Sequence, residues 1–102
     1  MNNFEERFKI FFEKCQEIVS KWDEMRKNVY PATLHINQGS RYIKIVRKDI
    51  SSKSVWAFVD KINGDVLKPA SWSAPAKHAR GNIFDEHNGL KNIGYYGPAY
   101  LR

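Results

Sequence analysis

The first thirty residues carry apolar side chains at spacings that alternate between four and three positions. This spacing fills the a and d positions of a heptad and is typical of an amphipathic helix with one apolar stripe. Pro31 disfavours helical backbone in the residue before it, so the pattern predicts one long helix within residues 1–30. The stripe contains Phe4, Phe8, Phe11, Cys15, Ile18, Trp22, Met25 and Val29.

Two interpretations of this stripe are open. It covers a sheet of the same chain, which its width favours because Phe12 and Val19 flank it. Alternatively, its strict period pairs the helix with a second copy and makes the protein a homo-oligomer. Cys15 lies in the stripe and is interpreted as a buried, small apolar residue. The interface between copies would then contain Phe4, Phe8, Phe11, Ile18 and Trp22.

Residues 31–68 change from a helical to an alternating pattern. Short runs of β-branched and aromatic residues, separated by turn residues, predict three or four antiparallel strands at residues 33–37, 41–46, 55–59 and 65–68. Asn63-Gly64 is typical of a tight hairpin turn in which both residues have positive φ. The expected fold is therefore α+β, with one long N-terminal helix packed on a small antiparallel meander.

Residues 69–102 show no clear period and mix prolines, small residues, bases and aromatic residues. Their apolar content argues against disorder, so they are expected to form an irregular segment that wraps onto the sheet. A chain of 102 residues, 42% of them hydrophobic, suffices for one core. We therefore expect a single domain over residues 1–102.

The net charge of +6 is unevenly distributed. Residues 1–30 contain six bases and six acids, so the whole excess lies in residues 31–102. A basic surface favours an anionic partner. No apolar run approaches the length of a membrane span, and the N-terminus lacks the pattern of a secretion signal, so a cytoplasmic protein without a membrane partner is expected. The single cysteine excludes an internal disulfide framework.

One block of sequence resembles small uncharacterised proteins of tailed bacteriophages. It runs from Trp72 to Asp85, with the pattern W-x-A-P-A-K-H-A-R-G-N-I-F-D, and a second part spans Tyr96 to Arg102. The similarity covers roughly residues 41–102 and does not include the helix. The resemblance implies a viral protein acting in the host cell cytoplasm, and it fits an accessory protein directed against host defences. It implies no catalytic residues.

Candidate chemistry favours binding over catalysis. The chain has no Walker-type loop, no dinucleotide fingerprint and no nucleophile elbow, so we expect no enzyme and no cofactor. His78 and His87 lack an evident nucleophile to activate. Adjacent acids such as Asp85 and Glu86 are usually solvated, and three sequence neighbours rarely converge on one ion, so no metal site is expected.

The strongest candidate site is the basic segment at residues 77–82. We expect a turn there, in which cationic and amide donors surround Gly81 and bind a small phosphorylated ligand such as a nucleotide signal, which the protein sequesters. An aromatic ring would stack on the base. The predicted ligand-binding residues are Lys77, His78, Arg80, Asn82, Trp72, Tyr96 and Arg102.

Two other functions stay open. A second basic set on the strands would bind nucleic acid through its backbone, and it consists of Arg41, Lys44, Arg47 and Lys48. In that prediction Arg41 and Arg47 share one face of the sheet, while Lys44 lies on the other with Tyr42. Alternatively, the heptad helix occupies a host protein and inhibits it.

Overall fold

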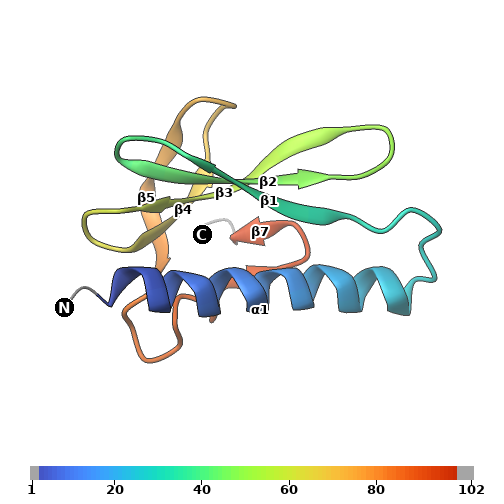
Figure 1. The fold of residues 1–102 in the computed structure, drawn as a ribbon, viewed down its shortest axis with the longest axis horizontal. Coiled ribbons are helices and arrows are strands. Elements are labelled where there is room, and N and C mark those ends of the chain that lie inside the picture. Colours follow the sequence, from blue (N-terminus) through green and yellow to red (C-terminus); the bar gives the residue numbers. More distant parts are fainter. Residues whose placement is uncertain (1–2, 99–102) are drawn as a thin grey trace.

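A computed structural model describes residues 3–98 of the chain. One helix lies along a five-stranded antiparallel sheet, and a two-stranded ribbon completes the α+β fold (Figure 1). This confirms the predicted class, with more strands than the sequence indicated. The elements are α1 (Phe4–Met25), β1 (Thr33–Gln38), β2 (Tyr42–Lys48), β3 (Lys53–Asp60), β4 (Asp65–Pro69), β5 (Pro75–Asn82), β6 (Ile93–Gly94) and β7 (Gly97–Pro98).

The sheet is a simple meander in the order β1-β2-β3-β4-β5, so each strand pairs with its neighbour in the chain. One face packs against α1 and encloses the core. The hairpin between β4 and β5 rises on the opposite side of the sheet, which we call the outer face (Figure 1). Every pairing is antiparallel and local, which is why short turns suffice to build the sheet.

The helix ends at Met25, several residues before the Pro31 that marks its end in the sequence. The chain reverses at Lys27, which has a φ of 52°, and the Asn28 amide N–H donates to the Asp23 carbonyl at 2.9 Å. This closes the last helical turn before proline is reached. Within residues 3–98 no helix is long and apolar enough to span a membrane.

The apolar stripe follows the 3.6-residue period of a straight helix rather than a heptad. Phe11, Cys15 and Val19 are fully buried, whereas Trp22 is 40% exposed and Met25 is 64% exposed. A 3.5-residue repeat drifts around a straight helix, so its later positions leave the sheet. Cys15 is buried as expected, and burial raises the pKa of its thiol.

The burial of Phe4, Phe8 and Phe11 argues against the predicted interface as one continuous exposed stripe on the helix. Phe4, Phe8 and Phe11 are buried in the core of their own chain and pack in sequence along α1. The structure thus shows the first of the two interpretations, in which the stripe covers the sheet of the same chain. Of the proposed interface residues, Ile18 is half-buried and Trp22 is exposed.

Residues 69–98 are more regular than predicted, because residues 75–82 form the fifth strand. Their side chains do not alternate between apolar and polar, and alanine, lysine and glycine are poor strand formers. The backbone nevertheless pairs with β4 from Asp65↔Asn82 to Pro69↔Pro75, with two irregularities in register. An edge strand is stabilised by this one ladder, so the missing alternation was not a sign of irregular structure.

The Asn63-Gly64 turn is also different from the prediction. Gly64 has a φ of +82°, but Asn63 is not among the residues with positive φ. The Gly64 amide instead donates to the Asp60 carbonyl at 2.8 Å, which makes a longer turn with only its last residue left-handed. The position needs glycine for a further reason, since an added Cβ would lie 2.6 Å from the ring of Phe84.

Candidate functional site

The outer face of the sheet gathers bases and aromatic rings from three hairpins. Strand alternation directs Tyr42, Lys44, Val46 and Lys48 of β2 to this face, because the intervening Ile43 and Ile45 are buried toward α1. We call this surface the outer basic face and define it by Arg41, Tyr42, Lys44, Lys48, Lys53, Phe58 and Trp72.

Trp72 lies at the centre of this surface. It sits in the β4–β5 hairpin, and its ring centroid lies 4.5 Å from Lys44 Nζ and 5.7 Å from Lys53 Nζ. The ring is 45% exposed, so one side chain offers both a support for the two ammonium groups and a free aromatic surface. Phe58 beneath Lys44 is buried and packs edge-on against Tyr42 with centroids 6.1 Å apart.

The lysines of this face lack compensating carboxylates. Among residues 3–98, no ion pair joins Lys44, Lys48 or Lys53 to an acid. Lys48 and Lys53 are direct cross-strand partners in the β2–β3 register. Like charges directly opposite one another are unfavourable, and a bound anion would relieve this repulsion.

Arg41 and a shallow hollow close one end of the outer basic face. Arg41 donates to the Asp60 carboxylate through Nε at 3.2 Å and Nη2 at 3.1 Å, and its guanidinium lies 5.2 Å from the centroid of the Tyr42 ring. The hydrogen bonds and charge of Asp60 raise the pKa of Arg41. The neighbouring hollow has a volume of about 420 Å³ and is bordered by Lys44 and Ser73.

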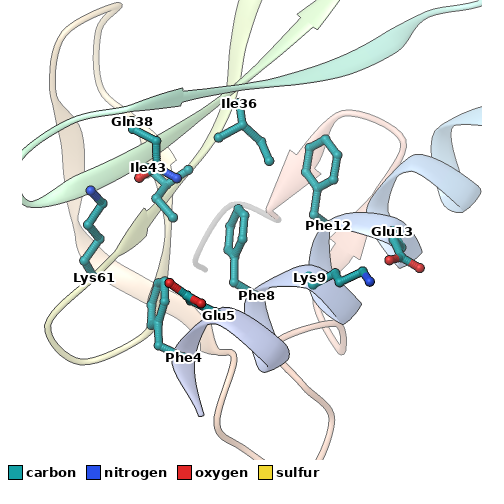
Figure 2. Close-up of a pocket in the computed structure, with 10 residues that line it drawn as sticks. All are labelled: Phe4, Glu5, Phe8, Lys9, Phe12, Glu13, Ile36, Gln38, Ile43 and Lys61. Carbon is teal, nitrogen blue, oxygen red and sulfur yellow. The ribbon is translucent and has the colours of Figure 1, made fainter. Parts of the chain in front are cut away.

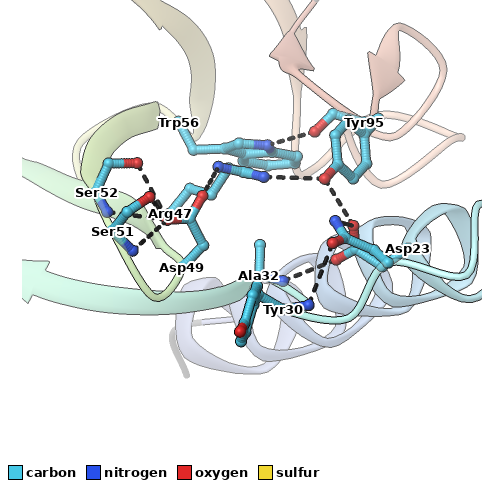
Figure 3. Close-up of polar contacts among 10 residues, drawn as sticks. Asp23, Tyr30, Ala32, Arg47, Asp49, Ser51, Ser52, Trp56 and Tyr95 are labelled. Carbon is cyan, nitrogen blue, oxygen red and sulfur yellow. Dashed lines mark hydrogen bonds and ion pairs between the residues drawn. The ribbon is translucent and has the colours of Figure 1, made fainter.

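Arg47 is not part of any exposed basic set, contrary to the prediction. It points to the α1 side, donating to the Asp49 carboxylate at 3.2 Å and to the Tyr95 hydroxyl at 2.9 Å (Figure 3). Tyr95 in turn donates to Asp23 at 2.7 Å, and the Trp56 indole N–H donates to the Tyr95 carbonyl. This polar cluster attaches the C-terminal ribbon to the helix and the sheet.

Plain alternation along β2 directs Arg47 to the same side as Ile43 and Ile45, whereas β3 carries a bulge. The β2–β3 register shifts between Ile45 and Val46, and Trp56 is the unpaired residue on β3. A bulge twists the strands and redirects the side chains beside it. The bulge brings Lys53 and Phe58, which are an odd number of residues apart, to the same face as their partners Lys48 and Lys44. The sequence placed Lys44 with Tyr42 correctly, but Arg41 lies before β2 and its guanidinium packs on the Tyr42 ring, so it does not share a face with Arg47.

The predicted site at residues 77–82 is strand β5 rather than a turn. The Asn82 amide donates to the Asn63 carbonyl at 2.7 Å and to the Asp65 carboxylate at 3.0 Å, and its oxygen accepts from the Phe84 amide. It therefore holds two hairpins together. Arg80 donates through Nη1 to the carbonyl of His78. Lys77 and His78 are exposed on the edge strand.

Two cations in this region do lie close together. Burial, followed by the charge of Arg80, lowers the pKa of Lys68. Tyr96, in contrast, stacks edge-on against Tyr95 at 4.9 Å, in the part of the fold that packs on α1. The structure thus separates Tyr96 from Trp72, and Arg102 lies outside the described residues.

The sequence missed Lys53 and Phe58 as members of the outer basic face. Phe58 belongs to a run that is apolar on both faces, so its orientation had no pattern to reveal it. Lys53 lies outside the strand predicted at residues 55–59, although it begins β3. Trp72 and Lys44 were assigned to two rival sites, and the fold of the β4–β5 hairpin brings them together.

Three carboxylates have pKa values below their ordinary range, each because it accepts several hydrogen bonds. Burial works to raise the pKa of Asp23 and Asp85, but bonds from Tyr95, Ala32 and Asn28 outweigh this at Asp23. Backbone amides of Gly89, His87 and Asn82 do so at Asp85. The backbone amides of Ser51 and Ser52 lower the pKa of Asp49 to about 2.

These depressed pKa values predict a protein that loses stability in acid. A carboxylate with a lowered pKa contributes its full stabilisation above its unfolded pKa of about 4, and loses it as pH falls through the folded value, so stability should decline from about pH 4 to about pH 2. Urea unfolding across this range measures the decline. Asp85→Asn should flatten the curve, whereas the exposed Glu86→Gln should not; equal curves for both variants would contradict the assignment.

The fold and the outer basic face define a small α+β protein with an open cationic and aromatic sheet surface. The chain belongs to a family of unknown function, DUF7717, whose model matches residues 3–101. No curated protein and no solved structure matches the chain significantly.

Proposed function

We propose that this protein is a non-enzymatic binding protein whose outer basic face takes single-stranded nucleic acid. The observation that carries the proposal is Trp72, an exposed ring that stands over the ammonium groups of Lys44 and Lys53. Aromatic rings on which bases stack, beside cations that meet the phosphates, are what sequence-independent binding of single strands requires.

The extent of the surface favours a strand over a small ligand. Cationic side chains recur at Arg41, Lys44 and Lys48. With a rise of about 3.3 Å per residue, the distance from the first to the last is about 23 Å along β2. A line of this length exceeds a mononucleotide. Lys48 and Lys53 lie opposite each other and neither forms an ion pair with an acid among the described residues. They add a second place where a bound phosphate would reduce repulsion.

The small-ligand site predicted at residues 77–82, which lies in β5, has less support than the outer basic face. The Asn82 amide, which was expected to orient a ligand, is fully used between hairpins. Sequestering a small ligand normally needs a site that surrounds most of it. A nucleotide signal therefore enters the experiment below as a competing result.

The test is binding of a labelled oligothymidylate, measured by fluorescence anisotropy over a range of salt concentrations. Trp72→Ala should weaken binding about tenfold, because stacking of one base contributes about 1–3 kcal/mol. The double variant Lys44→Gln with Lys53→Gln should reduce the slope of log affinity against log salt by about 1.4, since each phosphate contact contributes about 0.7 for single strands.

Matched controls separate this site from its rivals. Lys91→Gln removes an exposed lysine outside the outer basic face and should leave the affinity and the salt slope unchanged. Arg80→Ala should also bind normally. Loss of binding in Arg80→Ala alone, or binding of mononucleotides without binding of the oligonucleotide, would overturn the proposal in favour of a small-ligand site at β5.

The setting of this activity follows from the phage resemblance of residues 41–102. It implies an accessory protein acting in the cytoplasm of an infected host, and an anti-defence role would fit binding to a nucleic acid that the host defence produces or recognises. This part of the proposal rests on the resemblance alone.

A further inference from the structure

Strand β1 is one of the two edge strands of the sheet, and α1 protects only its first half. The Ala32 amide donates to the Asp23 carboxylate at 2.8 Å, and the Leu34 amide donates to Gln16 Oε1 at 2.7 Å. Leu34 therefore directs its N–H away from β2, and Ile36 does the same by strand alternation. Within residues 3–98, no group of the fold is shown bonded to this outward amide of Ile36.

An apolar hollow of about 520 Å³ lies beside this unprotected half, between β1 and the N-terminal half of α1. Phe8 and Phe12 point from the helix toward the strands, where Ile36 and Ile43 lie opposite them (Figure 2). Ile36 is 39% exposed at this place. We call the hollow and the adjoining half of β1 the edge groove.

An open strand edge beside an apolar groove is a template for an added strand. We propose that the edge groove pairs with the edge groove of a second copy, so that two β1 strands join antiparallel around a two-fold axis. The proposal does not depend on what the outer basic face binds.

The charges along the edge groove favour a second copy as the occupant. Glu5, Lys9 and Glu13 follow one another along the helix at the rim. A two-fold axis brings residue i of one copy to residue j of the other and the reverse, so a rim carrying both signs is self-complementary. A strongly charged peptide would instead meet both attraction and repulsion there.

The geometry of antiparallel pairing gives the second argument. Partners across an antiparallel pair point to the same face, so both Ile36 side chains would lie on the α1 side, each against the other copy's Phe12. Residues 1–30 have no net charge, and the two outer basic faces would lie on the same side of the joined sheet without facing each other. The basic excess of the chain therefore does not oppose this contact directly.

The test is the oligomeric state of the full chain, measured by sedimentation equilibrium at tens of micromolar protein. The wild type should have twice the monomer mass. Ile36→Lys should raise the dimer dissociation constant at least tenfold, whereas Ile62→Lys, at an even more exposed position in the β3–β4 turn, should leave it unchanged. Circular dichroism establishes that each variant is folded.

Lys9→Glu provides a second variant that does not touch the sheet. It makes the helical side of the rim entirely acidic at an exposed position of α1, so the fold should survive while the dimer weakens. A monomeric wild type would overturn the proposal. A dimer that persists in both Ile36→Lys and Lys9→Glu but is lost in Trp22→Lys would also overturn it and assign association to the C-terminal end of α1.

Discussion

Asp23→Ala should lower the free energy of unfolding by about 3 kcal/mol, because it leaves several buried donors without an acceptor. The carboxylate is 2% exposed and accepts from the Tyr95 hydroxyl at 2.7 Å, the Ala32 amide at 2.8 Å and the Asn28 side chain at 3.1 Å. It joins the helix, the start of β1 and the C-terminal ribbon at one point (Figure 3). Urea unfolding monitored by circular dichroism measures the loss.

The neighbouring Glu24 provides the control for this prediction. It is exposed in the same helical turn, so Glu24→Ala should change the free energy of unfolding by no more than about 0.5 kcal/mol. Tyr95→Phe removes only one of the three donors and should fall between the two. If Asp23→Ala and Glu24→Ala are equally stable, the buried cluster does not hold the C-terminal segment.

Gly97→Ala should be about as damaging, with an expected loss of about 3 kcal/mol. Gly97 has a φ of +97°, a backbone conformation that costs a residue with a side chain roughly 1–2 kcal/mol. An added Cβ would also lie 2.5 Å from the carbonyl oxygen of Trp56. That oxygen is backbone in β3, so the ribbon would have to move away from the sheet.

Gly94 is the matched control, since it lies in the strand that pairs with Gly97. An added Cβ at Gly94 meets nothing within 4 Å, and its φ is not in the positive range. Gly94→Ala should therefore unfold at nearly the wild-type urea concentration. Equal losses of unfolding free energy in the two variants would show that the ribbon tolerates a side chain at neither position. The close contact with Trp56 would then not explain the effect of Gly97→Ala.

The stability variants and the binding variants change opposite sides of the sheet, so effects on folding and on affinity can be separated. Asp23 and Gly97 hold the side of the sheet that faces α1, whereas Trp72 and Lys44 lie on the outer face. Trp72→Ala should therefore alter affinity without a comparable change in unfolding. Arg47→Ala, by contrast, removes a donor to Tyr95 and would confound a nucleic-acid assay through the fold.

Prediction from the sequence succeeded where one local pattern decides the structure. The helical spacing located α1, and the strand runs located β1 to β4 within a few residues. Prediction failed where backbone pairing decides whether a segment is a strand, or where a bulge decides which face a side chain lies on. Strand β5 has no apolar alternation because it lies at an edge, and the shift beside Val46 brings Lys53 and Phe58 of β3 to one face. The outer basic face depends on the same shift.

The sequence by itself determined the α+β class, the neutral helix and the concentration of positive charge in residues 31–102. These properties follow from composition and periodicity, which act between neighbours in the chain. Only the tertiary structure decided that Trp72 stands over Lys44 and that Asn82 and Arg47 hold the fold together. The reason is that these contacts join residues far apart in sequence, and their partners are set by strand register and hairpin curvature.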